Sequence, residues 1–221
     1  MREVVAVITA RGGSNGFPGK NLALFRGRPL VTHTVSTALE TPGIGRVVVT
    51  TDDPEIASHS TGALVVTRPP ALSGPESRSV DAVLHVVAEL GVSDALLVLL
   101  QPTTPLRTSA DITECLTLHD NRPTGSVIQM TTATHHPWKS CILHDGHITP
   151  AHDWPDLEAP RQSLPPPLRP TGGIYLVSAA DLTTHHRFFI PEVRAQLIPA
   201  DRAIDIDTPA DLVRAHLSTS T

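Results

Sequence analysis

Short apolar runs alternate along this chain with segments of helical periodicity. Runs of strand length, rich in β-branched residues, predict strands at residues 4–10, 46–50, 63–67, 95–100 and 126–131. Apolar side chains every three or four positions predict helices from about residue 29, from Pro54, over 79–90 and over 108–119. Residues 95–100 are apolar without a break, which is typical of a central parallel strand covered on both faces. The pattern predicts an α/β fold with a doubly wound, mostly parallel sheet.

The alternation stops at residues 134–170, which are rich in His and Pro and contain no long periodic segment. A loop of that length in a compact domain is usually functional or is held by another chain. Regular elements resume at residues 172–177, 179–184 and 195–198. Residues 203–212 predict a strand that enters a last helix, with Thr208 as its cap and Pro209 in its first turn. We expect a single domain over residues 1–221, from which 134–170 form an excursion.

A glycine-rich loop, RGGSNGFPGKN at residues 11–21, follows the first predicted strand. Glycines allow backbone amides to face an anion, and Arg11 and Lys20 add cationic donors. The spacing fits neither G-x-G-x-x-G nor G-x-x-x-x-G-K-[ST], in which Asn21 would have to be a hydroxyl residue. Such turns also occur as plain connections. Strand, loop and helix together with two cations favour a site for a nucleoside triphosphate.

Polar residues follow the ends of several predicted strands: Arg11, Asp52, Asp53, Gln101 and Thr103. Ligands of open α/β sheets bind outside the carboxyl ends of the strands. We therefore expect these five side chains to line one crevice.

Two carboxylates, Asp205 and Asp207, stand two positions apart near the end of the chain. On an extended segment such residues project to the same side, so both can reach one hard cation. Mg²⁺ is typically held by one or two carboxylates together with substrate phosphate oxygens and water. The alternative is that Asp207 caps the last helix and Asp205 is solvated.

Composition excludes several classes of function. A formal charge of −5 and only seven aromatic residues (four Phe, two Trp, one Tyr) argue against a nucleic-acid partner. Cys115 and Cys141 are too few for a disulfide framework and lack metal-ligand spacing. Glu3 and the short apolar run argue against a signal peptide, and no stretch is long enough to span a membrane. We expect a cytoplasmic protein.

Five segments together resemble the acylneuraminate cytidylyltransferases, which make CMP-sialic acid. They are ITARGGSNGFPGKN, LLQPTTPLRT, HHPWK, PRQSLPPPLRPTGGIYLV and AIDIDTPADL. They occur in the family's order from Val4 to Leu212, and the ordered set is specific although each motif alone is weak. Enzymes that activate Kdo share the fold and the first motif. HHPWK, the PRQ…LRP segment and the Phe188-Phe189 pair favour the sialic-acid branch.

The resemblance implies a role for each matching position. Nucleotide contacts are implied for Arg11, Ser14, Asn15, Lys20, Asn21, Arg68, Ser79 and Gln101. Contacts with the acidic sugar are implied for Gln101, Lys139, Arg161, Tyr175, Phe188 and Phe189. The catalytic set would be Arg11, Lys20 and Asp207, with Mg²⁺ or Mn²⁺ on Asp205 and Asp207. Lys139 and Arg161 suit the C1 carboxylate of the sugar. The excursion would reach into a partner subunit, which implies a homodimer with shared sites.

One position departs from the family. The family usually has a cation in the S-K-G or S-x-R triplet, whereas this chain reads Ser14-Asn15-Gly16, which puts the rate or the exact substrate in question. Other acceptors for the same chemistry are Kdn, legionaminic acid, pseudaminic acid, Kdo or a phosphonate. A non-catalytic nucleotide-binding module is a further alternative. A Rossmann dehydrogenase lacks the glycine spacing that its cofactor requires.

Overall fold

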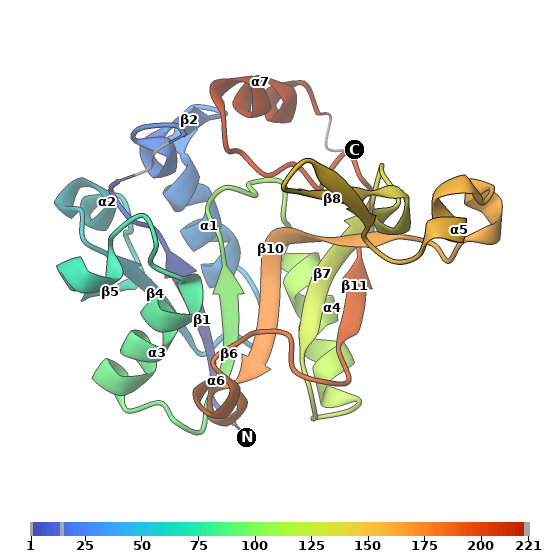
Figure 1. Ribbon diagram of the computed structural model, residues 1–221. Helices are drawn as coiled ribbons and strands as arrows, with labels where there is room; N and C mark the ends of the chain where they lie inside the picture. The colour runs from blue at the N-terminus through green and yellow to red at the C-terminus, as the bar shows by residue number, and fades with distance from the viewer. Residues whose placement is uncertain (1, 14–15, 219–221) are drawn as a thin grey trace.

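The computed structural model describes residues 2–13 and 16–218. Within them, one sheet has the strand order β11-β7-β10-β6-β1-β4-β5 (Figure 1). Its strands are β1 (Val4–Thr9), β4 (Arg46–Thr51), β5 (Leu64–Thr67), β6 (Leu96–Leu100), β7 (Val127–Thr132), β10 (Leu168–Ser178) and β11 (Arg194–Leu197). Strand β10 runs antiparallel to both of its neighbours, and the other pairs are parallel. The prediction of a mostly parallel α/β sheet is confirmed.

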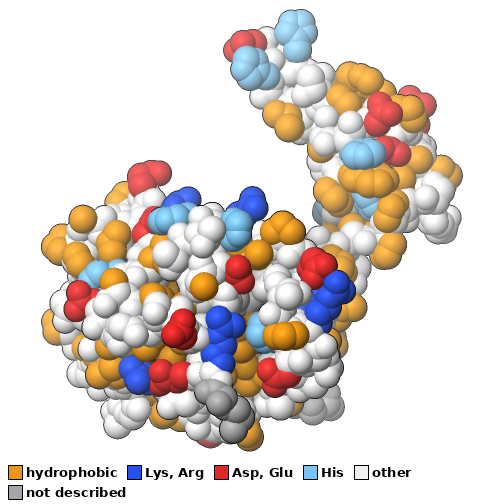
Figure 2. All heavy atoms as spheres, turned by 90° about the horizontal axis from the view of Figure 1, so that it is seen from below, with side chains coloured by type: hydrophobic (Ala, Val, Ile, Leu, Met, Phe, Trp, Pro, Cys, Tyr) orange, Lys and Arg blue, Asp and Glu red, His pale blue; other side chains and the backbone are white. Residues whose placement is uncertain are grey.

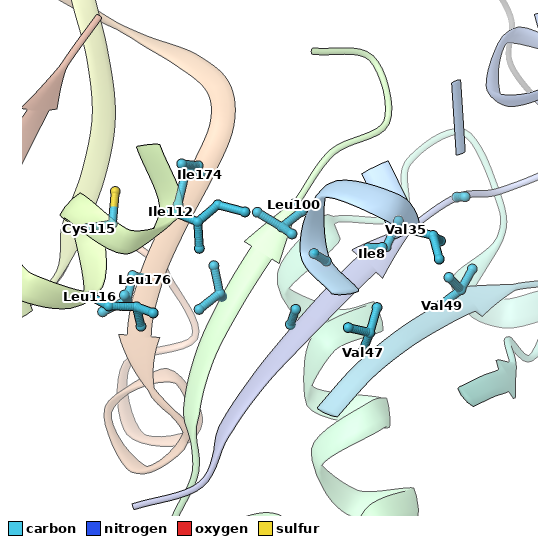
Figure 3. Close-up of a cluster of buried hydrophobic side chains, with 14 of the residues drawn as sticks. Ile8, Val35, Val47, Val49, Leu100, Ile112, Cys115, Leu116, Ile174 and Leu176 are labelled. Atoms are coloured by element: carbon cyan, nitrogen blue, oxygen red, sulfur yellow. The ribbon is translucent and has the colours of Figure 1, made fainter. Parts of the chain in front are cut away.

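Helices cover both faces of the sheet (Figure 1). One face packs against α1 (Leu30–Leu39) and α4 (Ser109–Asp120), and Figure 3 shows the resulting cluster, in which Ile8 and Leu100 meet Val35 and Ile112. The other face packs against α3 (Ser79–Leu90) and α6 (Ala179–His185). Both sides of β6 are therefore buried, as its unbroken apolar run predicts.

Local signals place the helix ends. Thr108 and Asp111 form a capping box at the start of α4, and Asp53 caps α2 (Pro54–Ser58), in which Pro54 is the first residue. Thr208 caps α7 (Pro209–Leu217) in the same way as Thr108 caps α4. The predicted strands and helices up to residue 132, and α7, agree with the structure to within one or two residues.

Two local predictions were wrong or incomplete. Residues 203–206 form no strand, because their neighbour is the loop after β6: Ile206 N donates to Thr103 O at 2.8 Å. The sequence reading also missed a two-stranded ribbon of β2 (Leu24–Phe25) and β3 (Arg28–Pro29), which follows the short helix η1 (Lys20–Leu22). This ribbon packs with Ile204, Ile206 and α7 in a third apolar cluster.

Residues 133–167, here called the arm, leave the sheet between β7 and β10. Ala133 N donates to Pro167 O at 2.9 Å where the two segments part. The arm contains η3 (Pro137–Lys139), β8 (Cys141–His144), β9 (His147–Pro150), α5 (Trp154–Glu158) and η4 (Arg161–Ser163). Figure 2 shows it as a projection from the body with hydrophobic side chains on its surface. The short elements explain why the sequence has no long periodic segment here.

Candidate functional site

A cavity of about 460 Å³ opens at the carboxyl ends of β1 and β6. It brings together nine residues expected from the sequence: Arg11, Lys20, Asn21, Arg68, Ser79, Gln101, Thr103, Asp205 and Asp207. We call it the nucleotide cavity. The glycine-rich loop near the amino end and the acidic pair near the carboxyl end therefore share one cleft.

Hydrogen bonds hold the described ends of the glycine-rich loop in place. Asn21 Nδ2 donates to Arg11 O at 2.9 Å, and Gly12 N donates to Asp52 Oδ1 at 3.0 Å. A Cβ on Gly12 would lie 2.7 Å from Asp53 Oδ2, so the close approach requires glycine. The Arg11 guanidinium donates to Gly74 O. Of the loop residues expected at the site, Ser14 and Asn15 lie outside the described residues.

The expected crevice of five strand-end residues is only partly correct. Arg11, Gln101 and Thr103 line the nucleotide cavity, whereas Asp52 and Asp53 do not. Asp52 accepts the Gly12 amide, and Asp53 accepts the Glu55 and Ile56 amides at 2.7 and 3.2 Å as the cap of α2. Both carboxylates are used to position backbone, which their place after a strand does not reveal.

The acidic pair lies opposite Lys20. Lys20 Nζ donates to Asp207 Oδ1 at 2.8 Å, and the Asp207 side chain is 71% exposed. Asp205 is more enclosed, and its Oδ1 is buried without a hydrogen-bond partner among the described residues. Burial raises the pKa of Asp205, and the charge of Asp207 raises it further, although Thr103 and Lys20 act in the opposite direction. Asp205 thus keeps one carboxylate oxygen without a hydrogen-bond partner among the described residues.

Three contacts hold the acidic segment in place. Arg202 forms a bidentate pair with the buried Asp111 at the start of α4, at 2.9 and 3.0 Å. Arg169 Nη2 donates to Ala203 O at 2.9 Å, in addition to the bond from Ile206 N to Thr103 O. The carboxylates are therefore positioned by contacts from α4, β10 and the loop after β6.

Arg68 is a buried cation in the wall of the nucleotide cavity. Its Nη2 donates to Thr50 O at 2.8 Å, and only 5% of the residue is exposed. Burial lowers its pKa; Asp52 opposes this effect, and the nearby Arg11 adds to it. Two close guanidinium groups with one carboxylate nearby leave this wall of the cavity suited to an anion.

A second cavity of about 330 Å³ adjoins the first, and we call it the acceptor cavity. Tyr175 and Phe188 line it with Leu99 and Val80, and Gln101 lines both cavities. The ring centroids of Tyr175 and Phe188 are 5.5 Å apart. Phe189 is not among the lining residues, although its ring centroid lies 6.2 Å from that of Tyr175.

Sequence reasoning did not single out several lining residues. These are Thr9, Gly16, Ser77, Arg78 and Pro102 in the nucleotide cavity, and Arg78, Val80, Leu99, His186 and Arg187 in the acceptor cavity. Proximity to a predicted helix start was the available signal for Ser77 and Arg78, which directly precede Ser79. Arg187 directly precedes Phe188 and Phe189 in the sequence, but no motif or residue spacing indicates that it lines a cavity.

Lys139 and Arg161 lie on the arm, and neither lines the two cavities of its own chain. Lys139 Nζ donates to Leu157 O at 3.0 Å, while Arg161 is exposed at the start of η4. If these two residues contact the sugar, as expected, they do so at a site other than the two cavities of their own chain.

Residues 5–139 match the family model described as Cytidylyltransferase. This chain belongs to the cytidylyltransferase family. The family supplies the enzyme class, nucleotidyltransferase, and this class suits a cleft that holds several cations beside a carboxylate pair. Within residues 2–13 and 16–218, no helix is long and apolar enough to cross a membrane.

Two groups of relatives align with the cytidylyltransferase over most of its length. It is 31% identical over 217 residues to the CMP-N,N'-diacetyllegionaminic acid synthase of Legionella pneumophila, covering 94% of this chain and 92% of the relative. It is 28% identical over 214 residues to the N-acylneuraminate cytidylyltransferase of Streptococcus agalactiae, covering 95% of this chain and 51% of the relative. The chain thus spans about half the length of that second relative.

A solved structure has the same fold. The structure of CMP:2-keto-3-deoxy-manno-octonic acid synthetase complexed with CTP superposes with a TM-score of 0.71 and 20% identity. The match covers 97% of this chain and 98% of the other. At this identity the likeness establishes the fold, and the site is argued from the residues of this chain.

Proposed function

We propose that this cytidylyltransferase transfers CMP from CTP to the anomeric hydroxyl of a nine-carbon 2-keto acid, with sialic acid (N-acylneuraminate) as the first candidate. One observation carries the proposal: Arg11 and Lys20 share the nucleotide cavity with Asp205 and Asp207. Cations beside a carboxylate pair suit a triphosphate with a divalent ion, and the adjoining acceptor cavity offers room for a sugar.

The reaction is an in-line displacement at the α-phosphorus of CTP. The anomeric oxygen forms a bond to phosphorus while the bond to the bridging oxygen breaks, and its electron pair leaves with pyrophosphate. The hydroxyl proton is released. Arg11 and Lys20 would neutralise the charge that builds on the pyrophosphate, and Asn21 keeps the Arg11 backbone in place.

The acidic pair fits a divalent cation, Mg²⁺ or Mn²⁺. No group of three or more His, Cys, Asp or Glu side chains suited to a metal occurs in the part of the chain that the structure describes. Two carboxylates suffice for Mg²⁺ when substrate phosphates complete its coordination shell. Asp205 Oδ1, which has no hydrogen-bond partner among the described residues, is an oxygen suited to ligate the ion. When bound by Asp205 and Asp207, the ion supplies charge stabilisation at the phosphates and acidifies the attacking hydroxyl.

The acceptor would lie against Tyr175 and Phe188, with Gln101 between it and the nucleotide. We assign Lys139 and Arg161 to the carboxylate of the sugar that is bound in the site of a partner subunit. This arrangement makes the enzyme a homodimer with shared sites. Two features support this: neither residue lines the cavities of its own chain, and the arm exposes Ile142, Leu143 and Ile148.

Legionaminic acid is the second candidate acceptor. The relative that carries this activity in its name aligns over 92% of its own length, whereas the N-acylneuraminate relatives align over about half of theirs. We place the reaction in the cytoplasm, where a chain with two free cysteines stays reduced.

Pyrophosphate release with CTP and Mg²⁺ tests the proposal against a panel of sialic acid, Kdn, legionaminic acid, pseudaminic acid and Kdo. We expect turnover with at least one nine-carbon acid and faster turnover with nine-carbon acids than with Kdo. No release with any acid of the panel, or release with Kdo alone, contradicts it. Replacing CTP by UTP controls for the base.

A further inference from the structure

The junction of the two cavities carries an inference that rests on the proposed function. Arg78, Ser79 and Gln101 line both cavities. The α-phosphate of CTP has to lie at this junction, because its phosphorus stays bonded to the cytidine while its bond to pyrophosphate is replaced by a bond to the sugar oxygen. Ser79 and Gln101 are neutral. Among the residues that the structure describes, Arg78 is the one cation that lines both cavities.

The other cations of the nucleotide cavity do not line its junction with the acceptor cavity. Lys20 pairs with Asp207, Arg68 donates to Thr50 O from a buried position, and Arg11 donates to Gly74 O. None of these three lines the acceptor cavity. They suit the pyrophosphate end of CTP, and the point where the acceptor oxygen attacks is left to Arg78.

The Arg78 side chain makes a contact that it can exchange. Its Nε and Nη2 donate to the two oxygens of Asp81 at 3.2 and 3.1 Å, and the side chains are 61% and 34% exposed. Exposed ion pairs contribute little to stability, so breaking this one costs little. Two oxygens of a phosphate offer a guanidinium the same two-pronged geometry as a carboxylate.

The backbone keeps Arg78 beside the glycine-rich loop. Arg78 is the residue directly before α3, and it follows a turn in which Ser77 N donates to Gly74 O at 3.1 Å. The same Gly74 carbonyl accepts from the Arg11 guanidinium. The segment that carries Arg78 is thereby tied to the glycine-rich loop.

We propose that Arg78 is a catalytic residue whose guanidinium exchanges Asp81 for the nonbridging oxygens of the α-phosphate of CTP. The acceptor oxygen bonds to the α-phosphorus there as the phosphorus–oxygen bond to pyrophosphate breaks, the electron pair leaves with pyrophosphate, and the hydroxyl proton passes to solvent. A cation at this point stabilises the transition state more than bound CTP, so it acts on kcat.

The test compares Arg78→Gln and Arg78→Lys with the wild type by pyrophosphate release, using the acceptor that the wild type prefers. We expect Arg78→Gln to lower kcat about 100-fold, with the KM values for CTP and acceptor within about threefold. Arg78→Lys recovers part of the loss as a point charge. Arg122→Gln removes a similarly exposed cation, paired with Glu192 at 2.8 Å outside both cavities, and leaves turnover unchanged.

Three results overturn the inference alone, provided that the wild type is active. One is an Arg78→Gln enzyme with kcat within about twofold of the wild type. The second is a loss confined to the KM for the acceptor, which assigns Arg78 to the sugar carboxylate. The third is an Asp81→Asn enzyme as slow as Arg78→Gln, since turnover then needs the ion pair and not its exchange. A wild type without pyrophosphate release contradicts the proposed function, and the inference falls with it.

Discussion

Apolar and acidic residues alternate along residues 203–207, and this alternation decides where the two carboxylates of the site point. Ile204 and Ile206 are buried in the third apolar cluster, whereas Asp205 and Asp207 line the nucleotide cavity. The apolar side chains fix the segment, and the acidic ones stay accessible. A substitution of Asp207 therefore changes the cleft and leaves the core intact.

Asp207→Asn is expected to lower kcat by at least about 100-fold, because it removes one charge of the proposed metal pair while keeping the size of the side chain. Pyrophosphate release in Mg²⁺ measures the effect, and thermal melting checks the fold. Asp94→Asn is the control, since Asp94 is an exposed carboxylate before the amino end of β6. Near-normal turnover of Asp207→Asn would contradict the metal assignment.

A second prediction concerns Gly172, which lies close to two residues of the site. Its φ is +81°, and an added Cβ would lie 3.0 Å from Gln101 Oε1 and 3.2 Å from Asp205 Oδ2. Gly172→Ala should lose about 1 kcal/mol of unfolding free energy and most of its kcat. Gly91→Ala is the matched control: its φ is +63° but no atom lies within 4 Å of the added Cβ, so stability falls and turnover does not. Equal loss of turnover in both variants would contradict the steric account.

Single residues were predictable where a motif or spacing marks them. The loop cations and the acidic pair were found because glycine-rich turns and paired carboxylates have a known chemistry. Arg78 was missed, because a lone arginine before a helix is more often a solvated side chain. Its importance follows from the cavities that it borders, and these depend on segments far apart in the sequence.

At the scale of elements, the acidic segment depends on its tether to α4. Arg202 is partly exposed, but its partner Asp111 is buried and also accepts from the Thr108 amide and hydroxyl at 2.8 and 2.9 Å. Arg202→Gln should lower the free energy of unfolding by about 2 kcal/mol at pH 7, because a buried carboxylate loses its counter-charge. Urea unfolding measures this. Arg46→Gln, which breaks the exposed pair with Glu3, should change it by less than about 1 kcal/mol. An effect of Arg202→Gln no larger than that of Arg46→Gln would contradict the tether.

The same tether makes stability depend on pH. Burial by itself would raise the pKa of Asp111, but hydrogen bonds from Arg202 and Thr108 outweigh it and lower the pKa. The unfolded chain binds a proton at Asp111 near pH 3.9, and the folded chain does so only at lower pH. This stabilisation is present above about pH 5 and is lost as pH falls through the folded pKa. The difference between wild type and Arg202→Gln should therefore shrink between pH 6 and pH 3. A constant difference would contradict this origin.

Elements were predictable where one local signal dominates. Apolar runs located β1, β4 and β6, Pro54 located the start of α2, and the cap at Thr108 or Ser109 located the start of α4. The antiparallel direction of β10 was not predicted, because direction depends on the route of the connection and not on the residues of the strand. Residues 203–206 resemble a strand in composition, but no strand of the sheet pairs with them to form a ladder.

At the scale of the whole molecule, the arm separates two expected sugar contacts from the body that would use them. Lys139 and Arg161 lie on a projection with exposed hydrophobic side chains (Figure 2). If the arm of one subunit completes the site of its partner, activity depends on residues from two chains. This arrangement can be tested by mixing two inactive variants, one with a substitution in the body and one with a substitution in the arm.

A mixture of Asp207→Asn and Arg161→Gln subunits, each inactive or nearly so alone, should regain activity when the chains are allowed to form mixed dimers. Each mixed dimer holds one site with an intact body and an intact arm, so equal amounts should give about a quarter of wild-type turnover. Light scattering checks that the species are dimers. The control mixture combines Asp207→Asn with Lys20→Gln, whose defects both lie in the body at one contact. Each site of that mixed dimer retains one defect, so no activity is expected. Recovery in the control, or none in the test mixture, would contradict shared sites.

The central claim is that CTP lies between the glycine-rich loop and the acidic pair. A crystal structure with CTP and Mn²⁺ tests it most directly, because the anomalous signal of Mn²⁺ locates the ion independently of the nucleotide. The account predicts an anomalous peak at Asp205 and Asp207, with the triphosphate extending from it to Arg11 and Lys20. A triphosphate bound outside this cleft, or an ion bound away from both carboxylates, would contradict it.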